Sequence, residues 1–182
     1  MKKILFLLLV ASFAGQLQAQ RYMTKTGTAV FTSKATLETI EGTNKASAFV
    51  LDTKNGALNA LIKIKSFVFD KQLMQEHFNE NYMESNKFPE AKFKGNIKNT
   101  SQINFTKDGE YQADIVGQLT IHGVTKNITE KARLIIKNGK ITLSGSFSVL
   151  LSDYEIKIPG AVKDKIAKSV KIDIDALLSP TN

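Results

Sequence analysis

The 182-residue chain contains no cysteine and only two histidines, His77 and His122. Without cysteine it forms no disulfide, so its core must hold the fold unaided, and it lacks the residue that bacterial lipid anchoring requires. A zinc site needs more nitrogen or thiolate ligands than this composition offers. No serine is placed with a base and an acid in a pattern typical of a nucleophile. We therefore expect no metal site, no catalytic residue and no enzymatic activity.

Proline is also scarce, and it occurs only at Pro89, Pro159 and Pro180. No internal repeat, proline-rich linker or low-complexity segment interrupts the chain. A chain of this length is sufficient for one domain that buries most of its apolar surface. We therefore expect a single domain over residues 20–182.

Long apolar runs are absent except at the start of the chain. There Lys2 and Lys3 precede an unbroken apolar run over residues 4–10, and Ala19 supplies a small residue at a cleavage site. This order is typical of a secretory signal peptide, and we assign residues 1–19 to it. The run is too short to cross a bilayer comfortably. We expect an exported protein, periplasmic or secreted, that is soluble and carries no lipid anchor.

Acidic residues are fewer than basic ones, with 17 against 25 and a formal net charge of +8. Removing Lys2 and Lys3 with the signal peptide leaves 23 basic against 17 acidic residues, a net charge of +6. A nucleic-acid site would place stacking aromatics on the same face as the charge, whereas many lysines here alternate with apolar residues, so we expect no nucleic-acid partner. Two interpretations of the positive charge stay open. In the first, the basic residues only form a solvated surface. In the second, they attract the protein weakly to an anionic membrane surface through the cluster Lys163, Lys165, Lys168 and Lys171.

What the chain has in place of these features is alternation. From Tyr111 to Ile121 every odd position is apolar or glycine, and the even positions are polar except Val116. A period of two indicates a strand with one dry face and one wet face. Similar patterns predict strands at residues 24–33, 45–52, 58–67, 91–98, 111–121, 124–137, 141–151 and 168–176. Eight strands, mostly antiparallel, predict an all-β fold that closes into a barrel and so removes exposed edges.

One segment has a different period. Over residues 71–82 apolar residues and His77 recur at helical spacing, and Asp70 precedes them as a candidate N-cap. The sequence therefore predicts one short helix between the third and fourth strands. We expect residues 70–88 to cap one end of the barrel as a lid over its interior.

Glycines fall on inward positions of long strands at Gly95, Gly117 and Gly145. A glycine on the dry face of a strand either bends the sheet or leaves space for something else, and both interpretations stay open here. The remaining interior is apolar, so a cavity in it would favour a long hydrocarbon, whose burial is worth about 0.8 kcal/mol per methylene. The residues that we expect to contact such a ligand, in the interior and at the mouth, are Phe31, Phe49, Ile62, Ile64, Phe67, Phe78, Phe93, Ile97, Ile115, Gly117, Leu119, Gly145, Phe147 and Val149.

Three segments together resemble a known family. They are Leu73-Met-Gln-Glu-His-Phe78, Lys87-Phe-Pro-Glu-Ala-Lys-Phe93 and Gly117-Gln-Leu-Thr-Ile-His-Gly-Val-Thr-Lys126. Their order and spacing resemble the YceI-like family of polyisoprenoid-binding proteins across nearly the whole mature chain. The resemblance implies an extended lipocalin-like antiparallel barrel in an exported protein that holds an isoprenoid chain or another long amphiphile, with a homodimer as an available state. The chain departs from the family pattern at residues 79–82 and 150–156, near the expected mouth.

The leading hypothesis is a lipid-binding protein for carriage, storage or stress response. Its barrel walls would bury a long isoprenoid or fatty-acid-like amphiphile and its rim would contact the head, with this lipid as the ligand and no other cofactor. The alternative hypothesis is a ligand-free structural or interaction barrel at the cell envelope, whose core is filled by its own side chains. An enzyme is the third and least favoured hypothesis, because no acid–base pair or metal set is visible.

Overall fold

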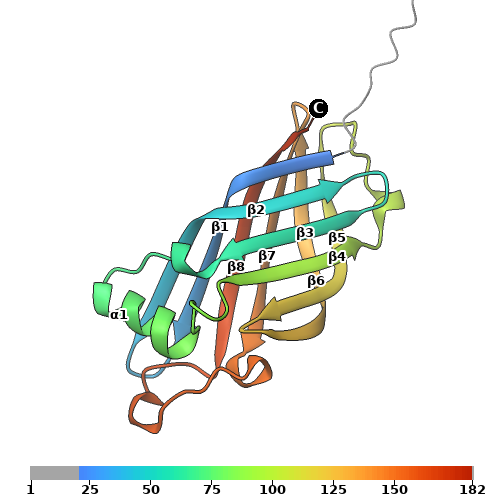
Figure 1. The fold of residues 1–182 in the computed structure, drawn as a ribbon. Coiled ribbons are helices and arrows are strands. Elements are labelled where there is room, and N and C mark those ends of the chain that lie inside the picture. Colours follow the sequence, from blue (N-terminus) through green and yellow to red (C-terminus); the bar gives the residue numbers. More distant parts are fainter. Residues whose placement is uncertain (1–20, 182) are drawn as a thin grey trace, which may run out of the picture.

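The computed structural model describes residues 21–181, in which eight antiparallel strands close into a barrel in chain order. Each strand pairs with its neighbours in the sequence, and β1 also pairs with β8 to close the sheet (Figure 1). The strands are β1 (Arg21–Lys34), β2 (Thr39–Asp52), β3 (Ala57–Lys63), β4 (Glu90–Ile97), β5 (Gly109–Ile121), β6 (Val124–Lys137), β7 (Lys140–Leu150) and β8 (Ser169–Pro180). The predicted eight-stranded antiparallel barrel is confirmed. The predicted signal peptide, residues 1–19, lies outside the described residues.

Two tight hairpin turns flank β6. His122 and Gly123, before β6, have φ angles of 50° and 77°, and Asn138 and Gly139, after it, have φ angles of 51° and 69°. Two successive left-handed residues form the turn whose twist matches that of antiparallel strands. Glycine adopts this conformation most readily, and asparagine and histidine adopt it more readily than most residues. These turns fix the register of β6 against both of its neighbours.

One half of the barrel is filled by its own side chains. The β2–β3 and β6–β7 turns lie at this end, and the inward residues of the strands interlock there into one cluster. Its fully buried members include Leu51, Leu134, Ile141 and Leu178. Filling of this kind suits an eight-stranded barrel, whose interior is just wide enough for its side chains.

The opposite end carries most of the helical turns. Between β3 and β4 lie η1 (Ile64–Ser66), α1 (Gln72–His77) and η2 (Phe78–Tyr82), the last of which is a turn of π-helix. Between β7 and β8 lie η4 (Leu151–Tyr154) and η5 (Gly160–Val162), whereas η3 (Thr100–Gln102) follows β4 at the filled end. The predicted short helix between the third and fourth strands is confirmed, and α1 lies beside the end of the barrel where β1 turns into β2 (Figure 1). We call residues 70–88 the lid segment. No helix within residues 21–181 combines the length and the apolar content needed to cross a membrane.

Some predicted boundaries are wrong, and β2 gives the clearest physical reason. It begins at Thr39, not at residue 45, because polar Asn44 occupies a fully buried position and hides the alternation. The Asn44 side-chain amide donates to the carbonyl of Lys63 at 2.9 Å, and its side-chain oxygen accepts from the Ala46 amide at 2.8 Å. A buried polar side chain that is satisfied in this way does not interrupt a strand.

Three other predicted boundaries also differ from the structure, each for its own reason. β3 ends at Lys63, not at residue 67, because the chain turns there into η1. β8 continues to Pro180, four residues past the predicted end, because it pairs with β1 as far as Tyr22. The predicted N-cap Asp70 is also wrong: α1 is preceded by Lys71, which makes no side-chain capping bond.

Candidate ligand-binding cavity

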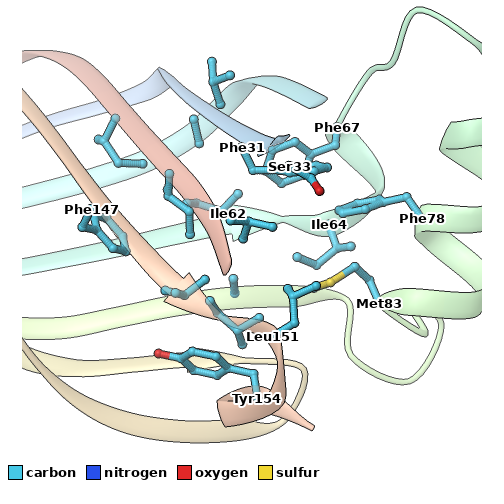
Figure 2. Close-up of a pocket in the computed structure, with 18 of the residues that line it drawn as sticks. Phe31, Ser33, Ile62, Ile64, Phe67, Phe78, Met83, Phe147, Leu151 and Tyr154 are labelled. Atoms are coloured by element: carbon cyan, nitrogen blue, oxygen red, sulfur yellow. The ribbon is translucent and has the colours of Figure 1, made fainter. Parts of the chain in front are cut away.

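A cavity of about 530 Å³ lies in the hollow half of the barrel. All eight strands contribute lining residues, together with residues of the lid segment and of the connection between β7 and β8. Figure 2 shows side chains of this lining, with Phe147 and Ile62 from the strands and Phe78 and Met83 from the lid segment. The lining is apolar over most of its surface, because the strands alternate and send their apolar residues inward.

Phe93 marks the boundary between the filled and the hollow halves, since it packs against buried clusters in both. Its ring lies over Gly95 and Gly117, which pair directly across β4 and β5. A Cβ on Gly117 would stand 2.6 Å from Phe93 Cζ and 2.5 Å from Gly95 Cα. Such separations are far inside the usual 3.5–4.0 Å or so of carbon contacts. These two glycines therefore make room for a phenylalanine of the protein itself.

Gly145 differs from this pair. It lines the cavity, and a Cβ built on it would stand 3.7 Å from the Ala132 side chain, an ordinary contact distance. The absent side chain at this position therefore leaves open space in the barrel wall.

Aromatic rings gather under the lid segment. Phe78, which follows α1, stacks on Phe31 of β1 with ring centroids 5.2 Å apart and an interplanar angle of 10°. The rings of Phe67 and Phe69 also contact the Phe78 ring, with centroids 5.5 Å and 5.0 Å from it. Aromatic pairs in such arrangements add about 0.5–1.5 kcal/mol each beyond burial. Phe78 thus attaches the lid segment to the barrel.

Polar groups of the lining lie mainly beside the β1–β2 connection and the lid segment, at the end of the cavity that we call the mouth. Lys71 pairs with Glu38 at 3.8 Å, and His77 and Lys165 are exposed beside the same opening. Ser33 is buried, and its hydroxyl accepts a hydrogen bond from the Ala167 amide at 2.9 Å. The mouth therefore offers both charged and hydrogen-bonding groups to a polar head, whereas the cavity behind it offers mostly hydrocarbon.

Tyr154 and Glu130 are ionisable lining residues that lie away from these groups. Tyr154 of η4 is only 2% exposed, and its hydroxyl makes no hydrogen bond within the described residues. Figure 2 shows this hydroxyl directed into the barrel, on the side where Phe147 lies. Burial raises the pKa of Tyr154, and the charge of Asp153 adds to the effect, so the phenol stays protonated and can donate. Glu130 of β6 is half-buried, and its carboxylate has no ion pair or hydrogen bond among residues 21–181.

His122 joins three segments at this end of the barrel. Its Nδ1 donates to the carbonyl of Tyr154 at 3.1 Å, and its Nε2 lies 2.9 Å from a carboxylate oxygen of Glu84 in the lid segment. The ring of Phe88 packs edge-on against the imidazole with centroids 4.6 Å apart. His122 therefore links the β5–β6 turn, η4 and the lid segment.

Most of the predicted ligand contacts meet in this one cavity. Those that line it are Phe31, Phe49, Ile62, Ile64, Phe67, Phe78, Phe93, Ile115, Leu119, Gly145, Phe147 and Val149. Ile97 and Gly117 do not line it: Ile97 is buried in the filled half, and Gly117 lies under Phe93. Sequence reasoning missed Met83, Tyr154 and Ile156, which lie outside the strands and so follow no period of two.

Comparison with known proteins agrees with this geometry. The chain matches the YceI-like domain over residues 19–178. It is 31% identical over 102 residues to a UPF0312 protein of Pseudomonas putida strain W619, covering 50% of this chain and 47% of the relative. It is 32% identical over 114 residues to a UPF0312 protein of Pseudomonas syringae pv. tomato, covering 57% and 54%. The chain thus spans about half the length of these relatives.

Solved structures share the fold at low sequence identity. A polyisoprenoid binding domain from Saccharophagus degradans superposes with a TM-score of 0.78 at 13% identity, covering 90% of this chain and 99% of that one. BcnA from Burkholderia cenocepacia superposes with a TM-score of 0.67 at 17% identity, covering 84% and 96%. The solved barrels show the shared fold, and because the domain match spans nearly all of the described residues, the chain belongs to the YceI-like family.

Proposed function

We propose that this protein binds a long-chain lipid, an isoprenoid or a similar amphiphile, inside its barrel. The observation that carries the proposal is the cavity of about 530 Å³, which is lined mostly by hydrocarbon. Phe93 separates this cavity from the filled half of the barrel. Ligand sites typically measure about 300–1,000 Å³ and are predominantly apolar with a few placed polar groups. A cavity of this kind favours a ligand by about 0.8 kcal/mol per buried methylene.

The distribution of polar groups supports an amphiphile as the ligand. A hydrocarbon chain would occupy the apolar interior, and its head would lie at the mouth beside Lys71 and Lys165. Tyr154 adds one buried hydroxyl to the interior, so a ligand with an oxygen atom along its length would find a donor there. The similar fold of a polyisoprenoid binding domain from Saccharophagus degradans supports the same ligand class.

The wider role is part of the proposal. The protein acts as a binding protein and not as an enzyme, and it carries or stores its lipid outside the cytoplasm, in the periplasm or as a secreted protein. The apolar segment at residues 4–10 supports export, and the lysines near β8 support a transient contact with an anionic membrane surface.

The test is organic extraction of the purified protein followed by mass spectrometry. We expect a lipid at close to one molecule per chain. A cavity-filling variant, Ala91→Phe, should lose it, because Ala91 lines the cavity. The matched control is Lys92→Phe, one residue along β4, where the side chain is exposed. A parent protein without lipid, and without lipid uptake on incubation, would favour the alternative of a ligand-free interaction barrel.

A further inference from the structure

The hydrogen-bonded ladder between β6 and β7 covers only part of these strands. Pairing runs from Lys137 and Lys140 at the turn to Ala132 and Gly145, and stops there. β6 continues to Val124 paired with β5 alone, and β7 continues to Leu150 paired with β8 alone. Two strand edges therefore face each other without a ladder, and Figure 1 shows β6 diverging from β7 along this stretch.

The cavity reaches this gap from the inside. Its lining includes inward-facing Ile128 and Glu130, which are half-buried, and also Lys131, whose exposed side chain pairs with Asp114 on the outer face. A second hollow on the outer surface shares Lys131, Ala132, Gly145 and Ile174 with the cavity. The inner and outer hollows therefore border the same part of the wall where the ladder ends, at Gly145, which carries no side chain.

The gap is bounded at its other end. After β7 the chain turns into η4, which contacts both β6 and β7. Tyr154 of η4 belongs to the same apolar cluster as Ile128 and Phe147, and the His122 bridge holds its carbonyl. The gap thus ends at the ladder on one side and at η4 on the other. We call this opening, bordered by Ile128, Glu130, Gly145 and Phe147, the lateral window.

We infer that the lateral window is a second opening of the cavity, through which an uncharged hydrocarbon chain or a neutral amphiphile passes without displacement of the lid segment. The inference rests on the proposed lipid-binding function and adds the route and the charge class of the ligand. Ile128 and Phe147 offer apolar contact on the two edges. The unpaired carboxylate of Glu130 repels an anionic head at this point, so anionic amphiphiles use the mouth, where Lys71 and Lys165 lie.

The experiment closes the window with a removable link. Because the native chain has no cysteine, Lys131→Cys with Ser146→Cys places the only two thiols on opposite edges, one position beyond the last ladder pair. A short bifunctional methanethiosulfonate reagent bridges them, and dithiothreitol removes the bridge. The matched control bridges Lys137→Cys with Lys140→Cys, an exposed pair on the same strands at the filled end. The readout is stopped-flow fluorescence of N-phenyl-1-naphthylamine, a neutral probe that brightens in apolar sites.

We expect the bridge at the window to slow both uptake and release of the probe roughly tenfold, with little change in Kd, and dithiothreitol to restore both rates. The control bridge should change neither rate. If the bridged window variant takes up the probe at the parental rate, or if both bridges slow it equally, the inference is overturned. A parent protein that never brightens the probe contradicts the lipid-binding function itself, and the window with it.

Two further variants keep the test independent of the bridge. Ser146→Phe places an aromatic ring in the outer hollow beside the window, outside the cavity, and should slow the neutral probe in the same way, with folding checked by circular dichroism. Glu130→Gln keeps the shape of the side chain and removes its charge. It should speed uptake of anionic 1-anilinonaphthalene-8-sulfonate more than uptake of N-phenyl-1-naphthylamine. Equal effects on the two probes would overturn the assigned charge selectivity.

Discussion

Replacing Gly117 with alanine adds one methyl group where the facing strand and the Phe93 ring leave no space for it. A Cβ at this position would stand 2.5 Å from Gly95 Cα and 2.6 Å from the carbonyl oxygen of Lys94. Both of these atoms belong to the backbone of β4, which cannot retreat without disturbing its ladder with β5. Alanine at Gly145 meets only the Ala132 side chain at 3.7 Å and the Lys131 carbonyl at 3.9 Å. Neither glycine has a positive φ, so the two substitutions differ in available space and not in backbone strain.

The magnitudes follow from two opposing effects. Exchange of glycine for alanine restricts the unfolded chain and stabilises the fold by about 0.4–1 kcal/mol where the site is compatible. Overpacking destabilises by about 1–3 kcal/mol. We therefore expect Gly117→Ala to lower the free energy of unfolding by about 1–3 kcal/mol, and Gly145→Ala to leave it unchanged or raise it by up to about 1 kcal/mol. For a protein of this size, the loss at Gly117 corresponds to a Tm lower by roughly 2–12 °C.

Urea denaturation followed by circular dichroism measures both variants against the parent, with Tm from a thermal scan as a second readout. Equal stability of the two variants would refute the reasoning, because the argument assigns the whole difference to the space around each Cβ. The same result would reopen the interpretation in which Gly117 faces ligand space.

Four further predictions concern the lid end and the surface. His122→Asn retains a residue that tolerates positive φ but removes the bridge to Glu84, so we expect stability to fall by about 1–3 kcal/mol and hydrogen exchange in residues 83–88 to quicken; unchanged exchange there would contradict the bridging role. Lipid loading should slow exchange throughout residues 70–88, whereas equal protection with and without lipid would argue against a lid. A hydrogen bond from Lys171 lowers the pKa of Asp173, so this pair contributes stability above the unfolded pKa of the carboxyl and loses it as the pH falls through the folded pKa. Asp173→Asn should therefore cost at most about 1 kcal/mol at neutral pH and nothing in strong acid, and a pH-independent cost in urea denaturation would sink this explanation. Changing Lys163, Lys165 and Lys168 to glutamine should weaken sedimentation with anionic vesicles at low salt, and equal binding by variant and parent would exclude this cluster from membrane docking.

Strand existence and strand faces were predictable because a period of two is written locally in the chain. The alternation from Tyr111 to Ile121 placed Ile115 and Leu119 inside, and both line the cavity. The turn at Asn138 and Gly139 was predictable for a similar reason, since it depends on two residues that tolerate positive φ. Asn44 shows where this reasoning fails: its burial depends on a carbonyl of Lys63 from another strand, which no local pattern reveals.

The cavity lining was predictable in part. Inward phenylalanines such as Phe31 and Phe147 followed from alternation, but Tyr154 and Met83 did not, because they reach the cavity from connections whose path is set by tertiary packing. The lid helix followed from its spacing, whereas its attachment through stacking of Phe78 on Phe31 joins residues 47 positions apart.

By itself, the sequence determined the antiparallel strands, their inner faces and the tight turns, because each depends on neighbours along the chain. The tertiary structure alone decided which half of the barrel is filled, since that depends on how inward side chains from eight strands meet. It placed Phe93 over Gly95 and Gly117, so the space beside these two inward glycines is filled by a side chain of the protein, whereas the space at Gly145 is open. It also ended the β6–β7 ladder at Ala132 and Gly145, beyond which η4 contacts both strands, because the pairing of two strands depends on both of their paths and not on the pattern of either one.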